Sequence, residues 1–429
     1  MTVPDATALA APGNAVSAAP AVRFIGERSA YWRLLIRGAV LLAFTLGIYR
    51  FWFATDVRRY LWSNTDVSGD TLEYSGTAFE LLMGFLIAIA LLIPLYVGLF
   101  LAALSLGEGG ELISVLAFPL LFFLGQFAIY RARRYRLTRT VFRGIRCHQT
   151  GSALRYAVCA MFWWVMIVLT LGLAYPFAQS RLERSKMRHT YYGNLQGRFE
   201  GSGFSLFLRG FPMWLLVIGP LVFAIAYSVT SVDWNAVASA ASGATSVEGF
   251  IGQLESKFPS IYVAAVLSIG AVAASIILAV TLFPVFQAMT LRWWLSGLRF
   301  GGLTVRSRLR ASQIYGAYLR FLWYGLLFTF AAGLIGSIGF VAYGFALSHL
   351  GKTPGSEIAG AAGAVVFYVA VMLGFSTIYQ GTVKLALWRC GAESAEFDGA
   401  GALDRVRAQG APGSPVGEGL ADALNVGSI

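Results

Sequence analysis

The chain has 429 residues, of which 57% are hydrophobic and 13% are charged, and its mean hydropathy is +0.66. This composition excludes a water-soluble globular protein, because a soluble surface of this extent would need many more charged side chains. The net charge of +12 comes from basic residues beside apolar segments, not from a soluble basic domain, which excludes a nucleic-acid-binding protein. The expected partners are the lipid bilayer and its anionic headgroups.

The first 22 residues are rich in alanine, proline and serine and carry no basic residue, so they are predicted to be a disordered tail and not a signal peptide. An aromatic-x-Gly step, Phe24-Ile25-Gly26, precedes the first apolar segment. Alternating stretches at 71–74 and 196–199 lead into two further copies of this step and predict short strands or tight turns. The further copies are Tyr74-Ser75-Gly76, Phe199-Glu200-Gly201 and Phe397-Asp398-Gly399, with a degenerate one at Gln149-Thr150-Gly151.

A longer motif follows the first apolar segment and returns 125 residues further on. Its basic half also recurs 75 residues after the first copy, and a weaker match recurs 108 residues after the second. Such self-similarity predicts an internally duplicated membrane protein. The first copy is Thr45-Leu46-Gly47-Ile48-Tyr49, Arg58-Arg59-Tyr60, Asn64-Thr65 and Gly76; the second is Thr170-Leu171-Gly172-Leu173, Arg184, His189-Thr190 and Gly201; the partial ones begin at Arg133-Arg134-Tyr135 and at Pro284.

Seven long uncharged runs occur along the chain, and each is able to cross about 30 Å of hydrocarbon as a helix. Runs of this length exclude a membrane-spanning barrel. The runs are Leu81 to Leu106, Leu112 to Tyr130, Ala157 to Ala178, Phe211 to Thr230, Ile261 to Leu291, Phe321 to Leu347 and Ile358 to Val383.

Basic clusters after Ala54, Tyr130, Ala178 and Leu291 place four loops in the cytoplasm by the positive-inside rule. The loops at 107–111, 231–257 and 351–357 carry few positive charges and are expected outside.

The apolar run at 157–178 complicates this topology, because it lies alone between two basic loops and a single crossing would put one of them outside. Its counterpart at 31–53 has only 12 uncharged residues between Arg37 and Arg50. We therefore expect an all-α polytopic membrane protein with six spanning helices, two re-entrant or interfacial helical segments and both termini in the cytoplasm. Eight spanning helices are the alternative, because the run at 157–178 is long enough to cross.

The expected organisation places one membrane repeat unit at 23–152 and a second at 153–316. A C-terminal helical hairpin follows at 317–390, and a cytoplasmic tail rich in glycine, alanine and proline, expected to be disordered, occupies 391–429.

The Thr-Leu-Gly-Ile-Tyr, Arg-Arg-Tyr and Asn-Thr elements of the first copy resemble the YjgN-type bacterial inner-membrane proteins. The resemblance covers roughly residues 24–400 and is most specific at 45–65; the second copy has Ala174 for the tyrosine and His189 for the asparagine. That family has no established activity. The resemblance thus implies a multi-pass location in the bacterial inner membrane, and no site residue.

Two sets of side chains are candidate sites. Amides near the inner ends of spanning segments would line a polar path, although interhelical hydrogen bonds are the simpler role for them. Basic residues next to the apolar runs would contact anionic lipid. The amides are Gln126, Gln287 and Gln380, and the basic residues are Arg58, Arg59, Arg131, Arg133, Arg134, Arg184 and Arg292.

No catalytic residue, metal site or cofactor is expected. The three histidines lack metal-ligand spacing, and the three cysteines are too few for a disulfide framework. Asp56, Glu80 and Glu183 lie close enough to a membrane boundary for structural ion pairs, and no acid lies deep in a long run, unlike in most ion-coupled carriers. Two functions stay open: a small-solute or ion transporter or channel, and a non-transport envelope protein that binds anionic lipid or a protein partner through its basic cytoplasmic face.

Overall fold

The structure is a computed structural model that describes residues 22–107, 110–233, 235, 259–409 and 416–424. The predicted N-terminal tail, apart from Val22, and most of the predicted outer loop at 231–257 lie outside these residues.

Within the described ranges, ten short strands form one antiparallel sheet in which each strand pairs with its neighbours along the chain. The short strands predicted at 71–74 and 196–199 are confirmed as parts of β3 and β7. The prediction of an all-α protein needs correction, since single strands of three to five residues gave too little pattern to reveal a whole sheet. The strands are β1 Val22–Phe24, β2 Thr65–Val67, β3 Asp70–Tyr74, β4 Thr140–Phe142, β5 Ile145–Gln149, β6 Thr190–Tyr192, β7 Leu195–Phe199, β8 Leu298–Phe300, β9 Leu303–Ser307 and β10 Ala395–Asp398.

Two-residue turns connect β2 to β3, β4 to β5, β6 to β7 and β8 to β9. In the turn Ser68-Gly69 the φ angles are 58° and 92°, and in Arg143-Gly144 they are 48° and 71°. Two successive positive φ angles are the hallmark of the type I′ turn, which matches the twist of paired strands. The glycine at the second position explains why these loops are so short.

The helices are arranged in pairs, and in the described chain five pairs each lie between two strands that pair with each other. Each strand–helix–helix–strand segment is called a unit here. The units contact one another in order, and α12 of the fifth contacts α1 of the first, which closes a ring. The pairs are α1 Arg28–Phe44 with α2 Arg50–Ser63; α3 Ala78–Ser105 with α4 Gly110–Arg139; α5 Ala153–Leu169 with α6 Tyr175–Arg188; α7 Gly203–Ser231 with α10 Pro259–Gly297; and α11 Ala311–Leu350 with α12 Pro354–Tyr379, η2 Gln380–Lys384 and α13 Leu385–Glu393.

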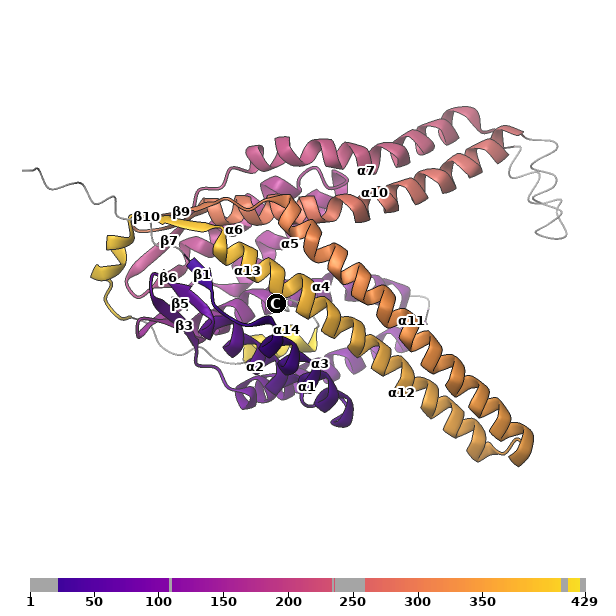
Figure 1. The fold of residues 1–429 in the computed structure, drawn as a ribbon. Helices are drawn as coiled ribbons and strands as arrows, with labels where there is room; N and C mark the ends of the chain where they lie inside the picture. Colours follow the sequence, from indigo (N-terminus) through magenta and orange to yellow (C-terminus); the bar gives the residue numbers. More distant parts are fainter. Residues whose placement is uncertain (1–21, 108–109, 234, 236–258, 410–415, 425–429) are drawn as a thin grey trace, which may run out of the picture.

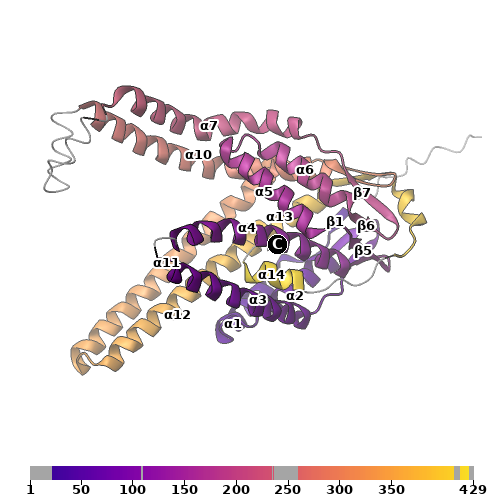
Figure 2. The same cartoon turned by 180° about the vertical axis from the view of Figure 1, so that it is seen from behind.

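The second, fourth and fifth units supply six helices that are long and apolar enough to cross a membrane. Figure 1 shows the strands at one end of the molecule, with the α7–α10 and α11–α12 hairpins extending away from them and diverging, and the reverse view in Figure 2 agrees. The protein is thus mostly helical, as expected of a polytopic membrane protein.

The first and third units contain the shorter hairpins, whose first helices have 17 residues each. The repeated Thr-Leu-Gly motif forms the turn in both. Leu46 and Leu171 have a φ of 50°, and the glycine after each has a φ above 90°. The Thr45 hydroxyl donates to Leu41 O at 2.7 Å and accepts from Tyr49 N at 3.0 Å, and Thr170 makes the same two bonds in the third unit. The same motif therefore gives the same sharp reversal twice.

The C-terminal region differs from the disordered tail that its composition predicts. β10 completes the sheet by pairing with β9, and residues 400–405 form a 3-10 turn, η3. A last helix, α14 Val416–Ala423, lies against α3 and α4, where Leu420 and Leu424 pack on Ala128 and Ala132. A few apolar residues in a glycine-rich sequence suffice for this packing. The predicted start of the C-terminal hairpin at 317 falls inside α11.

Aromatic-x-Gly steps join β1 to α1, β3 to α3 and β7 to α7, and the degenerate step at 149–151 joins β5 to α5. In Tyr74-Ser75-Gly76 and Phe199-Glu200-Gly201 the aromatic ring folds back onto the glycine. A Cβ on Gly201 would lie 2.4 Å from the Phe199 ring and 3.0 Å from Trp293. Only glycine leaves room for this close approach.

Replacing Gly201 by alanine is expected to lower the free energy of unfolding by about 1–3 kcal/mol, because the new methyl group must displace packed aromatic rings. Thermal unfolding of the purified protein in detergent measures the change. Gly316→Ala is the matched control, because a Cβ at that position meets no atom within 4 Å. Equal stability of the two variants would contradict the proposed packing.

Candidate functional site

An arginine joins the end of one unit to the start of the next at three junctions. Arg59 Nη2 donates to Gly76 O at 3.0 Å, and Arg184 Nη2 donates to Gly201 O at 3.2 Å. Arg134 donates to Gly151 O in the same way. Each arginine lies 17 residues before its glycine. The shared Arg and Gly of the sequence motif are therefore the two ends of one hydrogen bond.

The same register holds in every unit. Each second helix leads into a short strand, and an arginine stands six residues before that strand begins. We call these five residues the arginine belt. Each stands within six residues of the end of an apolar stretch, and Arg292 directly follows the one that ends at Leu291. Three are exposed and two, Arg134 and Arg389, are half-buried. The belt consists of Arg59, Arg134, Arg184, Arg292 and Arg389.

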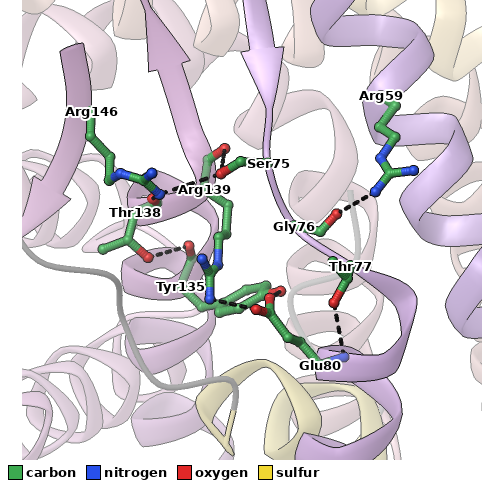
Figure 3. A network of polar contacts seen from close by, with 9 residues as sticks. All are labelled: Arg59, Ser75, Gly76, Thr77, Glu80, Tyr135, Thr138, Arg139 and Arg146. Carbon is green, nitrogen blue, oxygen red and sulfur yellow. Dashed lines mark hydrogen bonds and ion pairs between the residues drawn. The ribbon is translucent and has the colours of Figure 1, made fainter. Parts of the chain in front are cut away.

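Figure 3 shows the belt residue Arg59 beside a second polar network that holds the first turn of α3. Thr77 caps this helix by accepting from Glu80 N at 3.3 Å. The Glu80 carboxylate accepts from Tyr135 OH at 2.7 Å and from Arg139 Nη2 at 2.7 Å. The acid near the membrane boundary thus has a structural role, as its position in the sequence suggested.

Glu183 has the same kind of role, deeper in the protein. Its carboxylate accepts from Trp294 Nε1 at 3.0 Å, lies 3.7 Å from Arg133 Nη1 and forms an ion pair with Lys186. These contacts join α6 to α4 and to α10. Its side chain is only 8% exposed. Burial by itself raises the pKa of Glu183, but the ion pairs with Lys186 and Arg133 and the two hydrogen bonds outweigh it, so the pKa lies below its usual value.

Two tryptophans link the first unit to its neighbours on both sides. Trp388 Nε1 donates to Thr65 Oγ1 at 3.0 Å, and Trp62 Nε1 donates to Thr140 Oγ1 at 3.0 Å. The rings of Trp62 and Trp388 lie 4.8 Å apart. These contacts join the fifth unit to the first and the first to the second.

A cleft of about 510 Å³ opens between α1 and α2. Arg33 and Arg37 of α1 and Arg59 of α2 line it, and the first two are exposed. One acid, Asp56, also lines the cleft and accepts from Tyr49 OH at 3.5 Å. The charged groups around the cleft are therefore mainly cationic.

The three predicted amides occupy separate places. Gln126 is buried in α4, Gln287 Oε1 accepts from Tyr318 OH of α11 at 3.0 Å, and Gln380 Nε2 donates to Ser376 Oγ at 3.3 Å within its own helix. Among the described residues no hydrogen bond joins any two of these three side chains. The polar path therefore stays a prediction, and the bond of Gln287 is of the interhelical kind.

The predicted lipid-contacting arginines divide into two groups. Arg59, Arg134, Arg184 and Arg292 belong to the belt. Others are engaged inside the protein: Arg58 is 5% exposed and donates to Tyr74 OH at 3.1 Å, and Arg133 contacts Glu183. Arg131 is half-buried over Phe127, with 5.9 Å from its guanidinium carbon to the ring centre.

The sequence alone did not single out Arg389, Arg33 or the cleft. The fifth belt position, Arg389, is recognised only from its spacing to β10. The sequence did not predict this strand. Arg33 lies in an apolar segment without a motif, and its neighbours in space come from α2.

The six apolar helices of the described chain, long enough to cross a membrane, are consistent with a polytopic membrane protein, and the ring of helix pairs has a strand-containing end. The family model described as bacterial protein of unknown function (DUF898) matches residues 19–423, and the chain belongs to this family. This match confirms the resemblance found in the sequence. No curated protein and no solved structure matches the chain.

Replacing Glu183 by glutamine is expected to destabilise the protein by about 3–5 kcal/mol at neutral pH, because Lys186 and Arg133 lose their buried counter-charge. The lowered pKa means that Glu183 stabilises the fold above its unfolded pKa of about 4.3 and loses this effect as the pH falls through its folded value. The difference between wild type and Glu183→Gln should therefore shrink below about pH 4 in thermal unfolding.

Glu73→Gln, on an exposed strand position, provides the control and should change stability little at any pH. A difference between wild type and Glu183→Gln that stays constant down to pH 3 would rule out the ionic role of Glu183.

Proposed function

We propose that the protein is a multi-pass protein of the bacterial inner membrane that binds anionic phospholipid headgroups through its arginine belt on the cytoplasmic side. The observation that carries this proposal is the recurrence of an arginine at one register of all five units, next to the apolar helices. Headgroup phosphates attract basic residues close to a membrane surface, and arginine binds phosphate with paired donors.

The belt arginines can hold the fold and meet lipid at the same time. A guanidinium has five N–H donors, and the bond from Arg59 to Gly76 O uses one of them. Arg59, Arg184 and Arg292 are exposed, so their remaining donors face the surroundings of the protein. Arginine also keeps its charge at any physiological pH.

The geometry favours six spanning helices and two re-entrant or interfacial hairpins. β1 pairs with β2 and β5 pairs with β6, so the short hairpins α1–α2 and α5–α6 leave the sheet and return to it. A segment that begins and ends at the sheet has both ends on the same side of the membrane. Eight spans would require each of these two segments to cross the membrane once, so the geometry speaks against that alternative. With the sheet in the cytoplasm, every basic cluster lies on the inner side, as the positive-inside rule requires, together with both termini.

Internal duplication is part of this proposal. The sequence offsets of 75, 125 and 108 residues equal the separations between the first residues of the strands at Thr65, Thr140, Thr190 and Leu298. The motif copies thus occupy equivalent places in the units, as duplicated segments would.

Transport of a small solute or ion is the weaker proposal. It depends on three amides that lie on different units, and within the described chain no hydrogen bond joins any two of them. Catalysis is not proposed, since the charged side chains inside the protein form ion pairs and hydrogen bonds within the fold.

The belt residue Arg292 and its neighbour Arg181, which lies one helical turn before the belt residue Arg184 on α6, are both exposed and make no hydrogen bond or ion pair within the described chain. Neutralising these two arginines therefore tests lipid binding at the belt without breaking a bond of the fold. Arg181→Gln/Arg292→Gln is expected to weaken stabilisation of the protein by phosphatidylglycerol in mixed micelles, by about 1 kcal/mol per residue at low salt. The effect should fade as salt is raised. Thermal unfolding against lipid concentration measures it.

Arg306→Gln/Arg308→Gln removes the same charge from strand β9 and its end, where the two side chains are 77% and 80% exposed and pair with acids of β10. This control should respond to phosphatidylglycerol like wild type. A wild-type response from both double variants would refute the belt as the lipid site.

A further inference from the structure

The first and third units are built alike but differ in charge. Both have a first helix of 17 residues, the same turn and an arginine of the belt. At the offset of 125 residues, Arg33 corresponds to Val158 and Arg37 to Phe162. Val158 and Phe162 are 61% and 57% exposed, as lipid-facing side chains of a membrane hairpin would be. The first unit therefore has two arginines at positions where the third unit, with the same architecture, has apolar residues.

These arginines face a space that can hold a ligand. Gly38 lets the Phe53 ring lie directly against α1, since a Cβ there would be 2.2 Å from the ring. The cleft of about 510 Å³ is lined by Gly38 and Phe53 as well as by Arg33, Arg37 and Arg59. The two helices thus bring three guanidinium groups around one opening, with Asp56 as the single acid among the lining residues.

With the membrane surface placed at the inner ends of the apolar runs, the cleft lies near that surface. Asp56 stands nine residues before Thr65, and Arg131, at the end of the apolar run of α4, stands nine residues before Thr140. Arginines at the membrane surface can meet the phosphates of anionic headgroups. Within the described chain neither Arg33 nor Arg37 forms a hydrogen bond or ion pair.

Apolar surface continues from the cleft along α1. Ile36 and Val40, next to Arg37, are 54% and 48% exposed, and Phe44 at the tip is 81% exposed. A molecule with a phosphate group in the cleft could lay hydrocarbon along this face. Charge and apolar surface are therefore arranged as an anionic phospholipid would need them.

We propose that the cleft between α1 and α2 binds the phosphate group of one anionic phospholipid, held by Arg33, Arg37 and Arg59. This inference rests on the proposed function and goes beyond it, because it assigns a defined site to the first unit alone. Arg33 and Arg37 bind the phosphate, Arg59 supplies the donors that Gly76 does not use, and Asp56 weakens the site by its negative charge.

The test compares phosphatidic acid in neutral detergent with inorganic phosphate alone. The measured quantity is the concentration that gives half of the maximal thermal stabilisation. Arg33→Gln/Arg37→Gln is expected to raise this concentration for phosphatidic acid at least tenfold. Asp56→Asn should lower it severalfold, a gain of binding that a damaged fold would not produce. Arg209→Gln, at a similar distance from the sheet along α7 and outside the cleft, should leave it unchanged.

Each outcome decides one question. If Arg33→Gln/Arg37→Gln or Asp56→Asn responds like wild type while Arg181→Gln/Arg292→Gln loses its response, the cleft proposal fails and the belt stands. If no protein, wild type included, responds to anionic lipid, both proposals fail. If inorganic phosphate stabilises wild type as well as phosphatidic acid does at equal concentration, the site takes free phosphate and its assignment to lipid is overturned.

Discussion

The hydrogen bond from an arginine to a glycine carbonyl is the interaction on which the architecture of this protein depends. It ties the second helix of one unit to the loop before the first helix of the next, at Gly76, Gly151 and Gly201. A bond from a charged donor contributes about 1.5–3 kcal/mol and does not titrate, because arginine stays charged. The glycine is needed because an aromatic ring occupies the place of a side chain. The spacing of 17 residues between the arginine and the glycine thus fixes how the strands, the turn between them and the start of the next helix are placed.

This constraint explains how a protein with weakly packed spanning helices keeps its shape. In the candidate spans at most 28% of the most apolar window is buried, and in α12 none of it is. Lipid provides no hydrophobic force that brings such helices together. The units are instead held at the sheet end by strand pairing, by the Glu183 and Glu80 networks and by the tryptophans. The contacts at the sheet end therefore hold the long apolar helices in their positions.

The sequence revealed a large part of this arrangement. Long uncharged runs predicted the six apolar helices, the alternation at 71–74 and 196–199 predicted two strands, and the repeated motif predicted equivalent turns at Thr45 and Thr170. The complete sheet was missed, because strands of three residues have no measurable period and paired residues are up to 103 positions apart, as in Gly197 and Phe300. Four of the five belt arginines were among the candidates, yet the side chains around the cleft come from two helices that only the fold brings together.

The fifth unit stands out because it meets the first across the whole length of the chain. Trp388 reaches Thr65 over 323 residues, and α12 contacts α1. Since chains are made from the N-terminus, the first hairpin is synthesised long before the helices that will cover its flank. The ring therefore closes only when the fifth unit, which is synthesised last, packs against the first. Until α12 is made, the flank of α1 that it contacts stays uncovered, and the fifth helix pair completes the ring.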